Sequence, residues 1–205
     1  MNQSIDENAL VYIVDDDGAV RDSLSLLLKS VGIQNEAYDS ASAFLEGYRA
    51  DHVSCLVADI RMPGMSGLEL QRELNAQKVA IPIIFITGHG DVPMAVNAMK
   101  DGAVDFLTKP FRDQDFLSRV KVSLNEAKTG FDDQQKQREV RARYDLLTRR
   151  ESEVMELVVK GCANKVIAMD LGVSQRTVEL HRARVMQKMA VRSLAELVRL
   201  AELLK

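Results

Sequence analysis

Residues 9–17 read ALVYIVDDD, a short apolar run that ends in three aspartates. Four further strand-like runs follow, and each of the five is succeeded by a stretch with the spacing of an amphipathic helix. The runs lie at 9–14, 35–38, 54–58, 81–86 and 103–107, and the helical stretches at 18–31, 40–48, 67–76, 91–101 and from 113 onward. Five such repeats predict a parallel sheet covered by helices on both faces, which is an α/β fold. Ligands of such sheets bind at the carboxyl ends of the strands.

The charge balance changes along the chain and favours two domains over one large one. Of the 205 residues, 1–124 carry 11 Lys/Arg and 18 Asp/Glu, whereas 146–205 carry 11 and seven. An acidic front can hold a cation, and a basic tail has the sign expected of a segment that approaches a phosphate backbone. Residues 125–142 are polar and evenly charged, which is typical of a linker, here a helical one. We therefore predict a first domain over 1–124, this linker, and a second domain over 143–205.

Neither the cysteines nor the N-terminus indicates export. Cys55 and Cys162 are the only cysteines, and they offer no disulfide framework. The first ten residues lack the charged start and apolar stretch of a signal peptide, and no uncharged apolar run approaches the roughly 20 residues that cross a bilayer. We expect a cytoplasmic protein that has no membrane partner.

Polar side chains end four of the predicted strands. The Asp15–Asp17 triplet ends the first, Asp59 the third, Thr87 the fourth and Lys109 the fifth. In a parallel sheet all of them arrive at one edge. Several carboxylates at one place repel each other, and their pKa values rise unless a cation neutralises them. Hard oxygen ligands suit Mg²⁺, which takes one or two carboxylates, several waters and phosphate oxygen, so the set predicts a metal site that awaits a phosphoryl group.

Three side chains of this set have a role in phosphoryl transfer. Asp59 can be the nucleophile, because a carboxylate held beside Mg²⁺ and in line with phosphorus forms an acyl phosphate. Lys109 supplies a positive charge for one phosphoryl oxygen, and the Thr87 hydroxyl can donate to another. An aspartate triplet alone is more often a solvated strand end, but the hydroxyl and the amine argue against that interpretation. His89 can be imagined as a general base, although a solvated loop histidine fits its surroundings better.

These residues resemble the receiver domain of response regulators over the whole first half of the chain. The motifs are VDDD (14–17), DIRMPGMSG (59–67), ITGHGD (86–91) and FLTKPF (106–111), in order and correctly spaced. The resemblance implies a flavodoxin-like (βα)5 domain in which Asp59 takes a phosphoryl group from a phosphohistidine of a sensor histidine kinase. It also implies that Mg²⁺ is held by Asp16, Asp59 and the backbone carbonyl of Arg61, with Asp15 bound directly or through water.

The resemblance implies a cis peptide and a switch as well. The Lys109–Pro110 bond would be cis and would orient the amine. Thr87 and Phe106 would form the switch pair, in which the hydroxyl moves toward the phosphoryl group and the ring turns into the space that it leaves. Taken alone, Phe106 is as well explained as a core residue.

The last 60 residues have a helical period throughout. Helices are predicted at 149–160, 164–171, 175–189 and 193–204. Thr148 with Glu151, and Ser193 with Glu196, have the Ser/Thr-x-x-Glu spacing of a capping box. Four short helices can bury a small core, so the second domain is predicted to be all-α.

The middle two of these helices have the pattern of a helix-turn-helix. Gly172 allows a positive φ at the end of the first, and Ser174 can cap the second. On the second helix an apolar stripe lies opposite a polar and basic face, which is what a major-groove helix requires. The stripe consists of Val178, Val185 and Met189, and the opposite face of Arg176, Thr177, Leu180, Ala183, Arg184 and Gln187.

This segment resembles the four-helix LuxR-type DNA-binding domain over LTRRE (147–151), GCANKVIA (161–168) and SQRTVELHRARVMQKM (174–189). The resemblance implies that the first half of the helix from Gln175 enters the groove, that Lys165 and Lys188 grip phosphates, and that the last helix can pair two subunits. The expected DNA-binding residues are Lys165, Arg176, Thr177, Leu180, His181, Arg182, Arg184 and Lys188. His181 and Arg182 border the apolar stripe and are as well placed to pack locally as to touch the DNA backbone. A helical bundle with a basic solvated face, or a protein-docking module, is the alternative.

Together the two halves resemble the FixJ branch of response regulators and imply a two-component regulator of transcription, with activation favoured over repression. The expected partners are a sensor histidine kinase, promoter DNA, a second copy of the chain after phosphorylation, and RNA polymerase. Two versions of the switch stay open. Phosphorylation drives dimerisation through the face formed by 91–101, 103–107 and the helix from 113, or it releases a DNA-binding domain that the receiver covers.

Two rival functions remain. An aspartyl-phosphate phosphatase is the enzymatic one, but such enzymes need a general acid and a substrate-selecting cap, and the sequence indicates neither. We therefore expect no enzymatic activity beyond the receiver's own phosphoryl transfer and dephosphorylation. The other rival is a DNA-binding protein whose receiver no longer responds to phosphorylation.

Overall fold

The computed structural model describes residues 9–88 and 92–204. They form two compact units, of which the first ends at Phe131 and the second begins at Asp132. Within these ranges, no helix combines the length and the apolar character needed to cross a bilayer.

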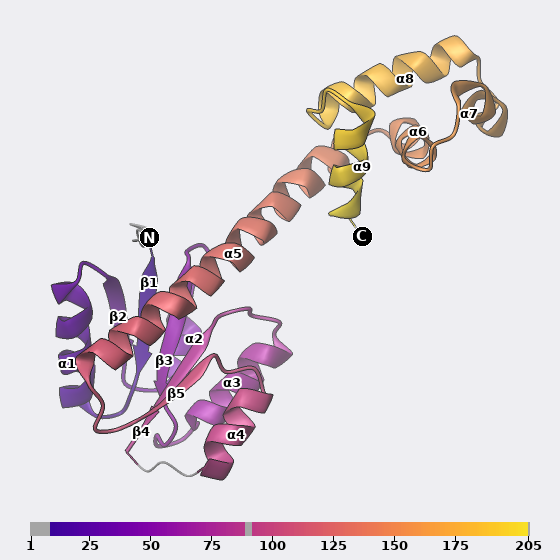
Figure 1. Ribbon diagram of the computed structural model, residues 1–205. Coiled ribbons are helices and arrows are strands. Elements are labelled where there is room, and N and C mark those ends of the chain that lie inside the picture. Colours follow the sequence, from indigo (N-terminus) through magenta and orange to yellow (C-terminus); the bar gives the residue numbers. More distant parts are fainter. Residues whose placement is uncertain (1–8, 89–91, 205) are drawn as a thin grey trace. The chain divides into compact units, whose positions relative to one another are not determined.

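The first unit contains a five-stranded parallel sheet with the strand order β2-β1-β3-β4-β5 (Figure 1). The strands are β1 Leu10–Val14, β2 Gln34–Tyr38, β3 Ser54–Asp59, β4 Ile83–Thr87 and β5 Asp105–Thr108. The helices that alternate with them are α1 Gly18–Ser30, α2 Ala41–Gly47, α3 Gly67–Ala76, α4 Val92–Lys100 and α5 Asp113–Asp145. The predicted α/β fold with five β–α repeats is confirmed. The strand order reverses between β1 and β3, and this reversal is where such folds bind ligands.

Two strands begin two residues later than the sequence pattern predicts. β4 begins at Ile83, because Pro82 has no N–H to donate to a neighbouring strand. β5 begins at Asp105, since the N–H of Ala103 donates to the Ala98 carbonyl at the end of α4 (2.9 Å) and so belongs to the helix terminus. Inter-strand hydrogen bonds nevertheless begin one residue before each assigned strand, since the Pro82 carbonyl accepts from the Leu56 N–H at 2.9 Å and the Val104 N–H donates to the Ile83 carbonyl at 2.8 Å.

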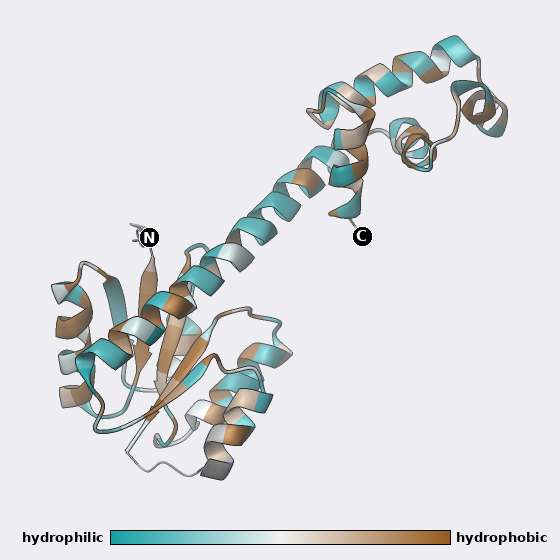
Figure 2. Ribbon diagram, in the orientation of Figure 1, coloured by the Kyte–Doolittle hydropathy of each residue, from teal (hydrophilic) through white to brown (hydrophobic). Residues whose placement is uncertain are grey.

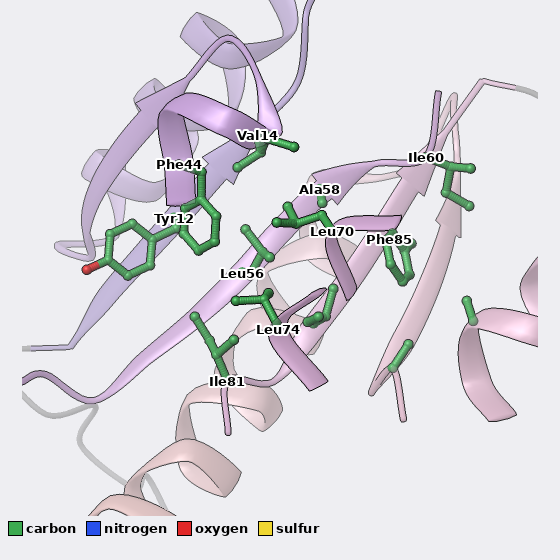
Figure 3. Packing of buried hydrophobic residues seen from close by; sticks show 14 of the residues in the cluster. Tyr12, Val14, Phe44, Leu56, Ala58, Ile60, Leu70, Leu74, Ile81 and Phe85 are labelled. Carbon is green, nitrogen blue, oxygen red and sulfur yellow. The ribbon is translucent and has the colours of Figure 1, made fainter. Parts of the chain in front are cut away.

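Hydrophobic clusters cover both faces of the sheet. Along β1, Tyr12 and Val14 point into one cluster, and Val11 and Ile13 point into the other, as the alternation of a strand requires. Figure 3 shows the first cluster, in which Phe44 of α2 packs against Tyr12. Figure 2 shows that β1 is hydrophobic and β2 largely hydrophilic, which fits the place of β2 at the edge of the sheet. This packing holds the carboxyl ends of the central strands in fixed positions.

The helix α5 contains the whole segment 125–142 that was predicted as a helical linker. Its first turns pack in the first unit through Phe116, Val120 and Leu124, whereas Val140 belongs to the core of the second unit. The core of the second unit thus includes a residue that precedes the predicted domain start at 143.

The second unit is all-α, as predicted, with a single hydrophobic core. After the end of α5 its helices are α6 Arg149–Val159, α7 Asn164–Leu171, α8 Gln175–Lys188 and α9 Leu194–Glu202. The capping box of Thr148 and Glu151 is present at α6. The second predicted box, at α9, is wrong: Ser193 does accept from the Glu196 N–H, but the Glu196 carboxylate accepts from the N–H of Arg192 and so serves the preceding turn.

Candidate functional site

Two buried aspartates and a lysine meet at the carboxyl end of the sheet. Asp15 follows β1 and Asp59 ends β3, and these strands are neighbours, while Lys109 follows β5. Nζ of Lys109 lies 2.8 Å from Asp15 Oδ2 and 3.2 Å from Asp59 Oδ1. Asp15 is 2% exposed and Asp59 is 8% exposed. The structure therefore brings together three of the predicted site residues from three different strands.

Burial dominates the electrostatics of Asp59. Loss of solvent raises the pKa of its carboxyl, and the raise is only partly offset by the Arg61 N–H, which donates to Oδ2 at 2.7 Å, and by Lys109. Burial also lowers the pKa of Lys109, but the hydrogen bond and charge of Asp15, with those of Asp59, outweigh it and the pKa lies above its ordinary value. Lys109 thus stays protonated beside Asp59, a carboxylate whose ionisation is costly.

The segment after β3 brings a helix close behind Asp59. Gly67 begins α3, its N–H donates to the Ile60 carbonyl at 3.0 Å, and a Cβ at this position would collide with the Asp59 carbonyl oxygen. Ser66 caps α3 with Glu69 in a complete capping box. A glycine at position 67 is therefore required by this close approach.

The donor set fits Mg²⁺. Two buried carboxylates, Asp15 and Asp59, already share one cationic group, Lys109, and Asp16 is exposed beside them. Among the residues that the structure describes, no three His, Cys, Asp or Glu side chains gather tightly enough to form a metal centre by themselves. Mg²⁺ does not need three, because one or two carboxylates with waters and a carbonyl satisfy it. Asp17 is not available to a metal in the same way, since its Oδ1 accepts from the Ala19 N–H and caps α1.

Thr87 and Phe106 lie on one face of the sheet. In the parallel register Phe85 pairs with Phe106 and Thr87 pairs with Thr108, so both switch candidates project to the same side. Thr87 is buried, and its carbonyl accepts from the Lys109 N–H at 2.7 Å. Phe106 is partly buried against the first cluster. The Lys109–Pro110 peptide bond is cis.

One polar group beside the switch candidates escaped the sequence analysis. Asp105 accepts from the Phe106 N–H (2.7 Å) through Oδ1 and from Arg119 of α5 through Oδ2. It therefore connects the backbone of Phe106 to α5. Its only sequence signal is an aspartate inside the otherwise apolar run AVDFL. His89 lies outside the described residues, as does the end of the ITGHGD motif.

In the second unit, the face of α8 that was predicted to be polar and basic is exposed at five of its six residues, the exception being the partly buried Thr177. Val178 and Val185 are buried as expected. Arg176, Leu180 and Arg184 are exposed and recur at helical spacing along one face, with Leu180 51% exposed. Lys165 on α7 is exposed too.

The other four predicted contact residues are engaged or partly buried within the unit. The Thr177 hydroxyl lies 2.8 Å from the Ser174 hydroxyl at the start of α8. The buried Nδ1 of His181 has no hydrogen-bond partner among the described residues. Arg182 Nη1 donates to Asn164 Oδ1 at 2.7 Å, and Lys188 Nζ donates to Glu151 Oε2 at 2.6 Å.

Comparison with known families places both units. The model described as response regulator receiver domain matches residues 11–121, and the model described as bacterial regulatory proteins, luxR family, matches residues 145–201. The chain therefore belongs to the response regulators, in the FixJ-type group that joins a receiver to a LuxR-type helix-turn-helix. It is a two-component regulator of transcription, and its family is not one of enzymes in the ordinary sense.

Individual relatives resemble the chain over nearly its full length. Response regulator protein TmoT of Ectopseudomonas mendocina is 45% identical over 98% of this chain and 91% of its own. Transcriptional regulatory protein FixJ of Rhizobium meliloti is 49% identical over 93% of this chain and 94% of its own. Among solved structures, the response regulator StyR has 47% identity and a TM-score of 0.86, covering 95% of this chain and 98% of that one.

Proposed function

We propose that Asp59 accepts a phosphoryl group from a phosphohistidine of a sensor histidine kinase and that this event controls DNA binding by the second unit. The observation that carries the proposal is the placement of Asp59, which is 8% exposed, ends β3, and lies 3.2 Å from the ammonium of Lys109. A buried carboxylate with a raised pKa is a better nucleophile than a solvated one, and the adjacent cation offsets the charge that phosphorylation brings.

The residues of the site divide the work of the transfer. An Asp59 oxygen forms the bond to phosphorus while the bond from phosphorus to the histidine nitrogen breaks, and that electron pair stays on the imidazole. Lys109 exchanges Asp59 Oδ1 for a phosphoryl oxygen and keeps its contact with Asp15. Asp16, Asp59 and the Arg61 carbonyl would hold Mg²⁺, with Asp15 bound directly or through water; the ion supplies positive charge for the phosphoryl oxygens. Loss of the phosphoryl group to water at the same site completes the receiver's cycle.

Thr87 and Phe106 transmit the change. The Thr87 hydroxyl moves toward the phosphoryl group, and the Phe106 ring turns into the space that it leaves. Phe106 lies on β5, which belongs to the face formed by α4, β5 and the start of α5, and Thr87 lies on the neighbouring strand β4. Exposed apolar side chains on that face, Val96 and Met99 of α4 and Val122 of α5, support dimerisation there.

The dimer then presents two copies of α8 to DNA. Arg176, Leu180 and Arg184 are the exposed residues through which α8 reads base edges, and Lys165 contacts a phosphate. Two linked domains bind paired half-sites more tightly mainly through effective concentration. The promoter-bound dimer activates transcription through RNA polymerase. Because promoter DNA lies in the cytoplasm of a bacterium, the protein acts there.

The experiment is incubation with acetyl phosphate and Mg²⁺. One stable phosphoryl group per chain, absent from Asp59→Asn, is the expected result, together with a dimer in sedimentation. Continuous phosphate release from many esters would favour a phosphatase instead. Phosphorylation without any change of oligomeric state would favour a receiver that no longer signals.

Footprinting separates the two versions of the switch. The fragment to compare with the full chain is 132–205, which keeps Val140 in its core, rather than 143–205. If this fragment binds no better than the unphosphorylated chain, the receiver does not act by covering α8. Stronger binding by the fragment would favour release over dimerisation.

A further inference from the structure

The end of α8 is tied to the start of α6 by a lysine. Nζ of Lys188, the last residue of α8, donates to Glu151 Oε2 at 2.6 Å and to the Leu146 carbonyl at 3.0 Å. The same Glu151 oxygen accepts from the Thr148 N–H at 2.8 Å. Glu151 is 2% exposed, while the Lys188 side chain is 33% exposed. The ammonium therefore has two protein acceptors before any DNA is present.

The electrostatics of this pair favour a fixed contact. The hydrogen bond from Lys188, with those from Thr148, lowers the pKa of Glu151 to about 2. The carboxylate is thus ionised throughout the working pH range and always attracts the lysine. To move onto a phosphate, Lys188 would have to leave a buried anion with no cation beside it and only the neutral donors of Thr148, which is unfavourable.

A second contact fastens α8 near its middle. Arg182 Nη1 donates to Asn164 Oδ1 at the first residue of α7 (2.7 Å). Beside the buried Val178 and Val185, α8 is thus held by two polar contacts, to α7 by Arg182 and to α6 by Lys188. Lys188 lies 12 residues from Arg176, or about 18 Å along the helix axis. A tilt of about 6° at the fastened end would therefore move Arg176 by roughly 2 Å, which is enough to break a base contact.

We propose that Lys188 is a positioning residue, which together with Glu151 fixes the direction of α8 and hence the place of Arg176, and that it does not contact a DNA phosphate. This role differs from the phosphate contact that the family resemblance implies. The inference rests on the proposed docking of α8 in the major groove.

The test uses two variants that change the charge in opposite directions. Glu151→Gln removes a negative charge, frees the ammonium and retains a capping-box residue, whereas Lys188→Met removes the positive charge. Full-length chain treated with acetyl phosphate and Mg²⁺ is titrated against a duplex that the wild type selects from random fragments, and against a random duplex of equal length. Both titrations are repeated over a range of salt concentrations, at a temperature at which circular dichroism shows each variant fully folded.

Positioning predicts that both variants lose affinity for the selected duplex by about tenfold, the effect of losing one base contact. The double variant loses no more than either single one, and the salt dependence stays that of the wild type. If Lys188 instead contacts a phosphate, Glu151→Gln should bind both duplexes more tightly, because the variant frees the Lys188 ammonium. Lys188→Met should then reduce the salt slope by about 0.9. That result would overturn the proposal, and so would wild-type affinity in both folded variants.

Two further variants keep the test decisive. Lys165→Met, which removes an exposed cation of α7, is the matched control and should lower affinity for both duplexes and reduce the salt slope. If Lys188→Met does not fold, Lys188→Arg takes its place, because arginine keeps both the positive charge and the hydrogen-bond donor. Wild-type affinity in Lys188→Arg, together with reduced affinity in Glu151→Gln, supports positioning. A wild-type chain that selects no sequence would overturn the DNA docking itself, which is a different failure.

Discussion

Each unit contains a lysine that pairs with a buried carboxylate, but the pKa values of the two carboxylates are shifted in opposite directions. In the first unit Lys109 is shared between Asp15 and Asp59, and burial leaves the pKa of Asp59 raised. In the second unit Lys188 serves one carboxylate, and its hydrogen bond, with those from Thr148, lowers the pKa of Glu151 to about 2. The lysine therefore stands beside a carboxylate that is costly to ionise at the proposed phosphorylation site, and beside a carboxylate that is readily ionised in the second unit.

The largest effect should come from Lys109→Met. Removal of the ammonium leaves Asp15 and Asp59 without their shared cation and removes the positive charge for a phosphoryl oxygen. We expect the rate of phosphorylation by acetyl phosphate to fall by about 100-fold or more, as for loss of one electrostatic donor. Intact-mass spectrometry over time measures the rate. The control is Lys121→Met, which removes an exposed lysine of α5. A wild-type phosphorylation rate in Lys109→Met would mean that Lys109 only neutralises the carboxylates of the unphosphorylated site.

The second effect in size is on stability of the second unit. Glu151→Gln should lower its free energy of unfolding at pH 7 by about 2 kcal/mol, the worth of a hydrogen bond to a charged group. Because the pKa of Glu151 is lowered in the folded state to about 2, wild-type stability from this group is present above the unfolded pKa of about 4.5 and is lost as pH falls toward 2. The variant should not show that loss. Hydrogen exchange read by mass spectrometry reports the second unit separately from the first.

The third effect has the opposite sign. The pKa of Asp59 is raised by burial, so its ionised form destabilises the first unit at neutral pH, and stability is gained as pH falls through that raised pKa. Asp59→Asn should therefore stabilise the first unit at pH 7, with the difference vanishing in acid. Hydrogen exchange of β1 and β3 peptides measures it. A destabilised Asp59→Asn would mean that the contact with Lys109 outweighs the burial of the carboxylate.

The difference between the pairs also explains what could be predicted from sequence. The parallel strands bring their carboxyl ends to one edge, so the arrival of Asp15, Asp59 and Lys109 at that edge follows from the parallel arrangement that the sequence predicts. The Lys188 contact does not follow, because its partner lies 37 residues away on a helix whose packing angle no local period encodes. Glu151 is visible in the sequence only as a capping residue. Helical spacing likewise placed Arg182 on the border of the basic face but could not show that Asn164 would accept its donor.

The smallest expected effect tests whether the burial of Glu151 is the reason that its pair with Lys188 stabilises the second unit. Arg149 pairs with Glu153 at 3.2 Å, four residues apart on α6, but the Arg149 side chain is 93% exposed. Water replaces its partner readily, and an arginine in the first turn opposes the helix dipole, so Arg149→Ala should change the unfolding free energy by less than about 0.5 kcal/mol. Urea unfolding of the fragment 132–205 measures it. Raising the salt to about 1 M should screen this exposed pair and leave the Glu151→Gln difference unchanged, because a buried pair is screened much less. A loss near 2 kcal/mol in Arg149→Ala would show that the pairing of charges, and not the burial of Glu151, distinguishes the second unit.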